Sequence, residues 1–552
     1  MRRYTIGVDY GSLSARGVLA DIENGEITAQ AEYVYPHATM DTCLPDGTLL
    51  GEDWALQHPV DYEQALEIII PALMRGVSPQ QVVGLGIDFT ASTVVPLDAD
   101  FRPLCKDPEF AGEPHAWPKQ WKHHAAQEEA KILHRILLEV CPEILDHFGG
   151  TVSMECLLAK AAETCRKAPR AYAKTAWFAE AGDYITSLLA GRPVCSLSAA
   201  SAKAKWLQGK GYPDAEIFRR LHPDMENLTD KLLLNHKECV SGYPGQRVGV
   251  LCPAMAEKLG LQPGTPLSAF QMDAYSGMPG VGLCQPGSAI LCMGTANSIM
   301  VLGQEPRPVF GATASLPDCY FPGIHGYAAG QASVGDGFAW FVRTCVPEQV
   351  REAAAREGLD IHRYLTRKAE KLSPGESGLL SLEWFNGDKS HPSMKLTGVM
   401  TGLTMQTRPE ELYRMLLEAT AYGARRILEH HENAGVKIHR LVACGGIAGK
   451  NKLMMQIYAD VLGREIQVST CTQAPALGAA IYAASAASDK PYQQVLFRAV
   501  EAMSWKETVL YRPRPEAQAV YEKLYQRYCA LADFFTGPGG DIMAQLAQLK
   551  SQ

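Results

Sequence analysis

The sequence has no long basic run and little excess of either charge: 60 acidic against 52 basic side chains give a net charge of −8. A general nucleic-acid-binding protein needs a cationic surface, so this composition argues against that class of function. No uninterrupted apolar stretch is long enough to cross a bilayer, and the first residues contain no apolar segment typical of a secretion signal. We therefore expect a soluble, cytoplasmic protein.

Cysteine is present, but in none of the patterns that give it a structural role. The fifteen cysteines are an odd number, and no two of them form a C-x-x-C pair. This spacing fits neither a disulfide framework nor a structural zinc site, so we expect reduced thiols. The histidine pairs at 123–124 and 430–431 have no carboxylate or cysteine at ligand spacing, and we interpret them as surface residues.

The length and the hydrophobic pattern predict a protein of two domains. A chain of 552 residues with 47% hydrophobic residues exceeds what one core usually supports. Short apolar strands alternate with longer helical patterns, which is typical of an α/β fold. A stretch dense in glycine and proline suggests a boundary near residue 285. We expect an N-terminal domain at 1–285, a C-terminal domain at 286–490 and a helical tail at 491–552.

The two halves show a weak internal repeat. Residues 4–22 predict a strand, a turn of small residues and a returning strand, and residues 288–302 predict the same arrangement. A later strand, ending at Asp88 in the first half and at Cys444 in the second, follows each hairpin. The clearest single helix begins at a capping box with Thr407 as N-cap and ends before Gly435.

Residues 7–16, GVDYGSLSAR, predict a hairpin tip that suits a phosphate group. Glycine in a tight turn lets backbone N–H groups approach a phosphate, and nearby hydroxyl and basic side chains add contacts. Asp9 stands at a strand end, where it could hold a metal-bound water. The P-loop pattern is absent, and an ordinary hairpin tip is the alternative interpretation. The candidate phosphate contacts are Gly11, Ser12, Ser14 and Arg16.

The second half offers a matching turn and a further glycine-rich loop. Gly294-Thr295 forms a second turn of glycine and hydroxyl, and two such turns could hold a polyphosphate from opposite sides. In the sequence 445–451, Gly445 and Gly446 follow a strand and leave a flat surface for a planar base, while Asn451 caps a helix or binds the base. An ordinary strand-to-helix turn explains this loop equally well.

Asp273 is the candidate general base. It lies among apolar and small residues next to the predicted domain boundary. A carboxylate in such surroundings can take the proton of a hydroxyl that attacks a phosphorus atom. The alternative is that Asp273 caps a helix beginning at Ala274.

Together these motifs resemble the FGGY carbohydrate kinase family of the actin-like ATPase superfamily, over nearly the whole chain. The two turns are similar to the family's two phosphate motifs, and residues 442–451 to its adenosine motif. The resemblance implies two RNase H-like α/β domains with a nucleotide and sugar cleft between them. It also implies ATP and Mg²⁺ as cofactors, with Asp9 holding Mg²⁺ through water and Asp273 as the catalytic base.

Segments 85–93 and 382–387 resemble the members of this family that phosphorylate L-ribulose. This likeness implies transfer of phosphate to a terminal primary hydroxyl, giving L-ribulose 5-phosphate in arabinose catabolism. Ala91, Lys203 and Asp273 match the expected sugar contacts. The sequence departs from the subgroup's pattern at Cys156, Tyr275 and Ala328, which bears on the choice of sugar.

Three alternatives stay open from the sequence. The first is a kinase of the same family for xylulose, ribitol or a heptulose. The second is an actin-like or chaperone-like ATPase without a sugar substrate, and the third is a sugar-binding regulator without catalysis. As partners we expect a small sugar and ATP, with no nucleic acid and no membrane, and a homodimer as one form of assembly.

Overall fold

The structure is a computed structural model that describes residues 2–391 and 395–550. The chain forms two compact units, and neither is continuous in sequence. The first unit comprises Met1–Cys284, Leu316–Gly326 and Gln473–Lys506. The second comprises Gln285–Ser315, Tyr327–Thr472 and Glu507–Gln552.

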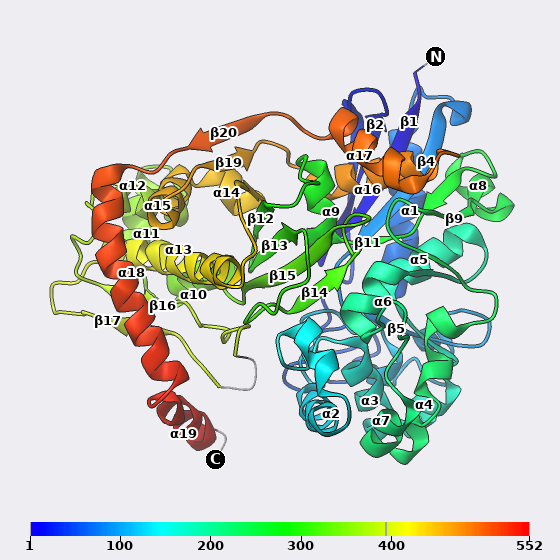
Figure 1. Cartoon of the computed structure of the whole chain (residues 1–552), viewed down its shortest axis with the longest axis horizontal. Coiled ribbons are helices and arrows are strands. Elements are labelled where there is room, and N and C mark those ends of the chain that lie inside the picture. Colours follow the sequence, from blue (N-terminus) through cyan, green and yellow to red (C-terminus); the bar gives the residue numbers. More distant parts are fainter. Residues whose placement is uncertain (1, 392–394, 551–552) are drawn as a thin grey trace. The chain divides into compact units, whose positions relative to one another are not determined.

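The first unit is built on a seven-stranded sheet, in which β1, β2 and β4 lie side by side (Figure 1). β1 pairs antiparallel with β2 and parallel with β4. The strand order is β3-β2-β1-β4-β10-β9, with β11 also on β4. The bounds are β1 Tyr4–Tyr10, β2 Ser14–Asp21, β3 Ile27–Val34, β4 Val82–Phe89, β9 Arg247–Val250, β10 Pro266–Ser268 and β11 Gln271–Met272.

Helix α16 (Ala474–Ala486) packs closely on β1 and β4 of this sheet. A Cβ atom built on Gly7 would lie 1.9 Å from the backbone oxygen of Ala476, and one on Gly86 would lie 2.2 Å from that of Ala479. The close approach therefore requires glycine on the strands.

The remaining elements of the unit are α1 Pro59–Leu73, β5 Val94–Leu97, α2 Gln127–Val140, α3 Leu157–Lys167, α4 Pro169–Lys174, β6 Trp177–Glu180, α5 Ala181–Ala190, β7 Val194–Ser196, α6 Leu197–Ala204, α7 Ala215–Leu221, β8 Val240–Gly242, α8 Pro253–Leu259, α9 Asp273–Gly280 and α17 Tyr492–Met503.

The division into units differs from the expected segments 1–285, 286–490 and 491–552. The first junction agrees, since the first unit's long segment ends at Cys284. Residues 473–506, however, belong to the first unit, because α16 fits the glycine-bearing strands there. Residues 507–552 belong to the second unit rather than forming a separate tail. Such long-range packing leaves no mark in local hydrophobic periodicity.

The second unit repeats the arrangement of the first. Its sheet has the order β14-β15-β13-β12-β18-β19-β20. β12 pairs antiparallel with β13 and parallel with β18, as β1 does with β2 and β4, which confirms the predicted repeat. The strand bounds are β12 Ser288–Met293, β13 Asn297–Gly303, β14 Ala314–Pro317, β15 His325–Gln331, β18 Arg440–Cys444, β19 Ile466–Ser469 and β20 Thr508–Tyr511, with β16 Leu380–Leu382 and β17 Val399–Thr401 as a separate pair.

The long helix α13 (Pro409–Asn433) packs with α15 and α18, and these helices share a large apolar core with strands of this sheet. The predicted capping box is displaced by one residue: the N-cap is Arg408, whose backbone N–H donates to Glu411, rather than Thr407. Pro409 fixes this start, because proline is favoured in the first helical turn. The other helices are α10 Gly335–Cys345, α11 Glu348–Arg356, α12 Ile361–Ala369, α14 Gly446–Lys450, α15 Lys452–Leu462, α18 Pro515–Thr536 and α19 Gly540–Lys550.

The surface interpretation of the two histidine pairs was wrong for one member of each. His123 is fully buried, and its Nε2 lies 2.8 Å from Glu163. His431 is also fully buried, with Nδ1 2.8 Å from the carbonyl oxygen of Ile427. Both rings are held by hydrogen bonds in the interior, which a residue's position in sequence does not reveal.

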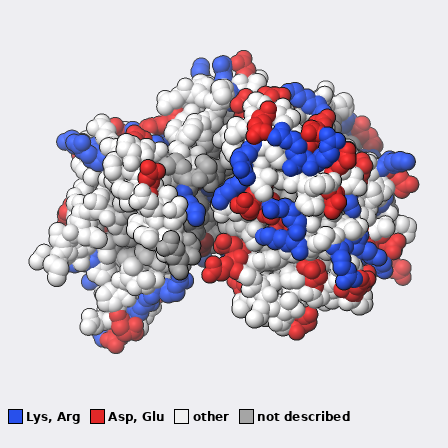
Figure 2. Space-filling model, turned by 90° about the horizontal axis from the view of Figure 1, so that it is seen from below, with Lys and Arg blue, Asp and Glu red and all other residues white. Residues whose placement is uncertain are grey.

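The distribution of surface charge and the character of the helices both bear on the sequence predictions. Figure 2 shows Lys and Arg interspersed with Asp and Glu over the face that it presents. Among the described residues, no helix has both the length and the apolar character needed to cross a membrane.

The packing of α16 on β1 yields a stability prediction. Gly7→Ala forces its Cβ against the α16 backbone, and we expect it to lower the free energy of unfolding by about 3 kcal/mol. Gly449→Ala is the control, since a Cβ there meets nothing within 4 Å. Urea titration of both variants measures the difference. Equal stability of the two variants would show that α16 does not pack on β1 as described.

Candidate active site

Two aspartates stand side by side at the ends of β1 and β4 in the first unit. Asp9 pairs in parallel register with Asp88, and the next residues, Tyr10 and Phe89, stack with ring centroids 4.9 Å apart. Burial raises the pKa of Asp9, while Asp88 and Arg16 oppose the rise. Burial, followed by the charge of Asp9, raises the pKa of Asp88 well above its usual range. Two carboxyls so placed favour retention of a proton on one of them.

Asp273 joins this pair as the first residue of α9. Burial, reinforced by the charge of Asp9, raises its pKa to about 7, and Lys203 opposes the rise. Its Oδ1 accepts a hydrogen bond from the N–H of Ala274 at 2.7 Å. The N-cap residue of α9 is Met272, so Asp273 is the first residue within the helix rather than the N-cap that the alternative expected. A carboxyl group titrating near neutrality is suited to general base catalysis.

The expected sugar contacts lie in the same unit. Ala91 follows β4 by two residues, and Lys203 lies in the last turn of α6. The same unit also contains a buried acid, Glu180, and a buried base, Lys160. Burial raises the pKa of Glu180 to about 7, a rise that Lys203 opposes, and burial lowers the pKa of Lys160 to about 8.

The sequence analysis missed Asp88, Lys160 and Glu180. For Asp88 a signal was present: the pattern glycine, apolar, aspartate, aromatic occurs at 7–10 and again at 86–89, and the two strands pair in that register. Lys160 donates to the backbone oxygens of Ser92 and Gln120, at 2.6 and 2.8 Å. No local motif marks this lysine, because its partners are backbone groups distant in sequence.

The predicted phosphate contacts of the first turn have partners within the unit. The N–H of Gly11 donates to the carbonyl of Ser14, which closes the turn. The side chains of Ser14 and Arg16 both contact Glu32 on β3, at 2.9 and 3.1 Å. Ser12 accepts a hydrogen bond from the indole of Trp121 at 3.0 Å. Their contact with a phosphate stays a prediction.

In the second unit the turn at Gly294 and Thr295 is exposed and tied to the start of α10. The carbonyl of Thr295 accepts from the N–H groups of Val334 and Asp336, at 2.9 and 3.1 Å. The N–H of Gly335 donates to the carbonyl of Gly294 at 3.1 Å. A Cβ on Gly335 would lie 2.7 Å from that carbonyl oxygen, so glycine permits the close approach.

The glycine-rich loop after β18 lies beside this turn. Gly445 has φ 99°, and a Cβ there would lie 2.5 Å from the carbonyl oxygen of Met293. Gly446 differs, because a Cβ there meets nothing within 4 Å. The protein itself therefore leaves open space over Gly446. Asn451 N-caps α15, with Oδ1 accepting from the N–H of Met454 at 3.0 Å, which satisfies its side chain within the fold.

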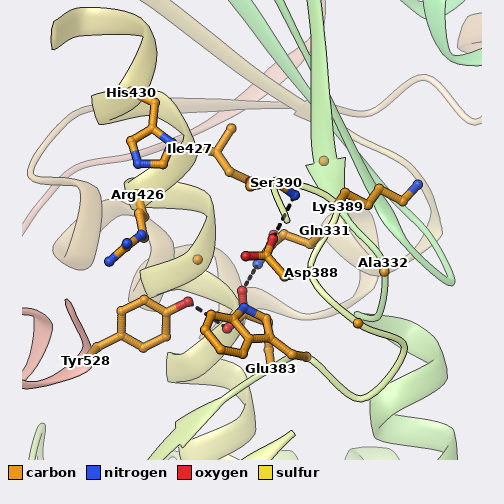
Figure 3. Close-up of a pocket in the computed structure, with 14 residues that line it drawn as sticks. Gln331, Ala332, Glu383, Asp388, Lys389, Ser390, Arg426, Ile427, His430 and Tyr528 are labelled. Atoms are coloured by element: carbon orange, nitrogen blue, oxygen red, sulfur yellow. Dashed lines mark hydrogen bonds between the residues drawn. The ribbon is translucent and has the colours of Figure 1, made fainter. Parts of the chain in front are cut away.

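A buried polar chain connects the second turn to the C-terminal helix α18. Asn297 donates to Gln331 at 3.0 Å, Gln331 donates to Glu383 at 3.0 Å, and Tyr528 donates to Glu383 at 2.9 Å. Figure 3 shows Glu383 between Gln331 and Tyr528. Burial raises the pKa of Glu383 to about 7. The adjoining cavity of about 20 Å³ has room for about one water.

A larger cavity of about 620 Å³ lies in the second unit beside α10. Asp336, whose N–H contacts the Thr295 carbonyl, lines it together with Trp340, Arg343 and Phe385. The rings of Trp340 and Phe385 stack with centroids 4.9 Å apart. A cavity of this size with aromatic walls is in the range of small-molecule sites.

Comparison with known proteins identifies the family. Residues 289–487 match the C-terminal domain of the FGGY family of carbohydrate kinases. The chain is 43% identical to a ribulokinase of Geobacillus thermodenitrificans, covering 100% of this chain and 97% of that one. It is 37% identical to a ribulokinase of Mycolicibacterium smegmatis, covering 100% and 97%.

Solved structures give the same fold. A xylulose kinase from Rhodospirillum rubrum aligns with a TM-score of 0.77 at 22% identity, covering 97% of this chain and 99% of the other. A ligand-bound xylulose kinase from Lactobacillus acidophilus aligns with a TM-score of 0.78 at 18% identity, covering 98% and 100%. At these identities the likeness shows the fold alone. With the full-length sequence relatives, it establishes that the chain belongs to the FGGY family of carbohydrate kinases.

Proposed function

We propose that this protein transfers the γ-phosphate of ATP to the terminal primary hydroxyl of L-ribulose, giving L-ribulose 5-phosphate. The observation that carries the proposal is the half-buried carboxyl of Asp273 beside Asp9 and Asp88, whose pKa of about 7 fits the general base that this reaction needs. The choice of sugar rests on the ribulokinase relative that is 43% identical over the full chain. Membership of a carbohydrate kinase family argues against the ATPase and regulator alternatives.

Asp273 accepts the proton of the sugar hydroxyl as that oxygen attacks the γ-phosphorus. Its pKa near 7 leaves a large fraction ionised at neutral pH while keeping it basic enough to take a proton. Phosphoryl transfer needs little covalent help from a protein, so positioning and charge neutralisation provide most of the rate.

Ala91 and Lys203 contact the sugar, with Lys203 as a donor to its hydroxyl groups. The electrostatic effect of Lys203 on both Asp273 and Glu180 supports placing the sugar near these groups. Tyr275 lies on the same short helix as Asp273 and stacks on Tyr320 with centroids 4.3 Å apart.

The nucleotide contacts come from both repeats of the fold. Gly294 and Thr295 bind phosphate oxygens through an exposed turn, and the open space over Gly446 holds the adenine ring. The hairpin tip with Gly11, Ser12, Ser14 and Arg16 supplies further phosphate contacts. The glycine at 446 supports this assignment, since no protein atom lies close enough to require it.

Mg²⁺ is the proposed metal, held by Asp9 through water. Carboxylate oxygens are the ligands that Mg²⁺ prefers, and it usually keeps several waters. Asp88 stands beside Asp9 in the sheet, so a second carboxyl group lies near the proposed ion. Bound with ATP, the ion neutralises phosphate charge. A cytoplasmic location and a homodimeric assembly remain predictions.

Asp273→Asn tests the base. We expect it to lower kcat by about 10²–10⁴-fold without loss of ATP binding, because the amide cannot accept the proton. A coupled assay for ADP release measures turnover, and calorimetry measures ATP affinity. Asp100→Asn, an exposed aspartate of the first unit, is the matched control. Near-normal turnover of Asp273→Asn would remove this residue from the base role.

Gly446→Arg tests the adenine position. The arginine side chain fills the open space over this residue, so we expect ATP affinity to fall by at least about tenfold, a change of about 1.4 kcal/mol in binding free energy. Gly446→Ala is the control, because one methyl group fits that space. Calorimetry measures both affinities. An unchanged affinity of the arginine variant would refute the assignment.

A panel of ketopentoses, pentitols and ketohexoses in the ADP-release assay tests the whole proposal. We expect the highest kcat/KM with L-ribulose. A higher kcat/KM for xylulose, ribitol or a heptulose would keep the kinase assignment and overturn the sugar. ADP release that no sugar stimulates would contradict the kinase function itself.

A further inference from the structure

Two cysteines face each other on neighbouring strands of the second unit. Cys292 of β12 pairs in parallel register with Cys444 of β18. Their sulfur atoms are 3.4 Å apart. Each strand runs directly from its cysteine into a proposed nucleotide loop: Cys292 precedes the turn at 294–295 by two residues, and Cys444 immediately precedes Gly445.

The geometry of the pair suits a disulfide. Neighbouring strands lie about 4.8 Å apart, which falls within the Cα separation of about 4.4–6.8 Å that a disulfide spans. Directly paired residues project to the same face, so both sulfurs approach without rotation of the backbone. Shortening the sulfur separation from 3.4 Å to about 2.05 Å requires only a small movement.

The two thiols differ in access to solvent. Cys292 is half-buried, whereas Cys444 is 5% exposed. A small oxidant therefore reaches Cys292 first, and Cys444 is positioned to resolve the oxidised product. Ordinary packing of two small apolar side chains is the alternative explanation for the contact between the sulfurs. That alternative predicts no disulfide under oxidising conditions.

We propose that Cys292 and Cys444 are a reversible oxidation site that forms a disulfide in the presence of a hydroperoxide. The Cys292 thiolate attacks the peroxide oxygen, the O–O bond breaks, and a sulfenic acid forms as the peroxide is reduced to water or an alcohol. The Cys444 thiol then attacks the sulfenic sulfur, which forms the S–S bond and releases water. Two electrons pass from the two thiols to the peroxide.

The disulfide alters the nucleotide loops, a consequence that rests on the proposed function. It draws β12 and β18 together where the backbone is already tightly packed, since a Cβ on Gly445 would lie 2.5 Å from the carbonyl oxygen of Met293. The strand ends cannot move without shifting the turn at 294–295 or the loop at 445–446. We therefore expect the oxidised enzyme to bind ATP more weakly than the reduced enzyme.

Peptide mass spectrometry tests the site itself. The full-length protein is treated with hydrogen peroxide, alkylated and digested without reductant. We expect a peptide pair linked through Cys292 and Cys444, lighter by two hydrogens and separated by dithiothreitol. Cys292→Ser abolishes the link, whereas Cys43→Ser, which removes an exposed cysteine of the first unit, leaves it. Oxidation of Cys292 without linkage to Cys444 would overturn the proposal.

Kinetics test the consequence separately. We expect peroxide to raise the KM for ATP several-fold in the wild type and in Cys43→Ser, but not in Cys292→Ser, with recovery after dithiothreitol. A linked enzyme with an unchanged KM for ATP would contradict the effect on the loops. A reduced enzyme that phosphorylates no sugar would instead refute the proposed function, while the peptide result would still decide whether the disulfide forms.

Discussion

The constraint on which the proposed chemistry depends is the placing of three carboxyl groups, two of them buried and one half-buried, at one end of the first sheet. Parallel pairing places Asp9 beside Asp88, and α9 begins with Asp273 in the field of Asp9. Ionising all three carboxyl groups so close together and with little access to water is costly, which raises the pKa of each. The same burial that disfavours ionisation gives Asp273 a pKa suited to exchanging a proton with an alcohol.

The second unit uses backbone shape rather than buried charge. The turn at 294–295 packs against Gly335, and the loop at 445–446 begins with Gly445. At either glycine a Cβ atom would collide with a carbonyl oxygen. The hydrogen bonds from Asn297 through Gln331 to Glu383 anchor β13, the strand that follows the turn at 294–295. These hydrogen bonds between buried side chains hold the start of that strand in place. In the proposed function, the first unit provides the base and the hairpin tip that contacts phosphate, and the second unit provides the turn at 294–295 and the loop at 445–446.

Much of this could be predicted from the sequence, because hairpin turns and glycine-rich loops carry local signals. The repeat and the positions of both turns followed from such patterns, and the kinase family followed from the resemblance of these motifs to those of a known family. The packing of 473–506 with the first unit did not, since it depends on contacts between α16 and strands several hundred residues away in sequence. The burial of Lys160 and of the His123 ring could not be predicted for the same reason, because their hydrogen-bond partners are distant in sequence. Asp88 could have been found, because its strand repeats the pattern around Asp9.

The pH dependence of kcat/KM for the sugar, at saturating ATP, tests the central claim most directly. A base must be deprotonated to act, and the raised pKa of Asp273 leaves it protonated at low pH. The account predicts a rate that rises about tenfold per pH unit at acidic pH and levels off above an inflection near pH 7. A profile that is flat from about pH 5 to 8 would show a carboxylate of ordinary pKa and would contradict the account.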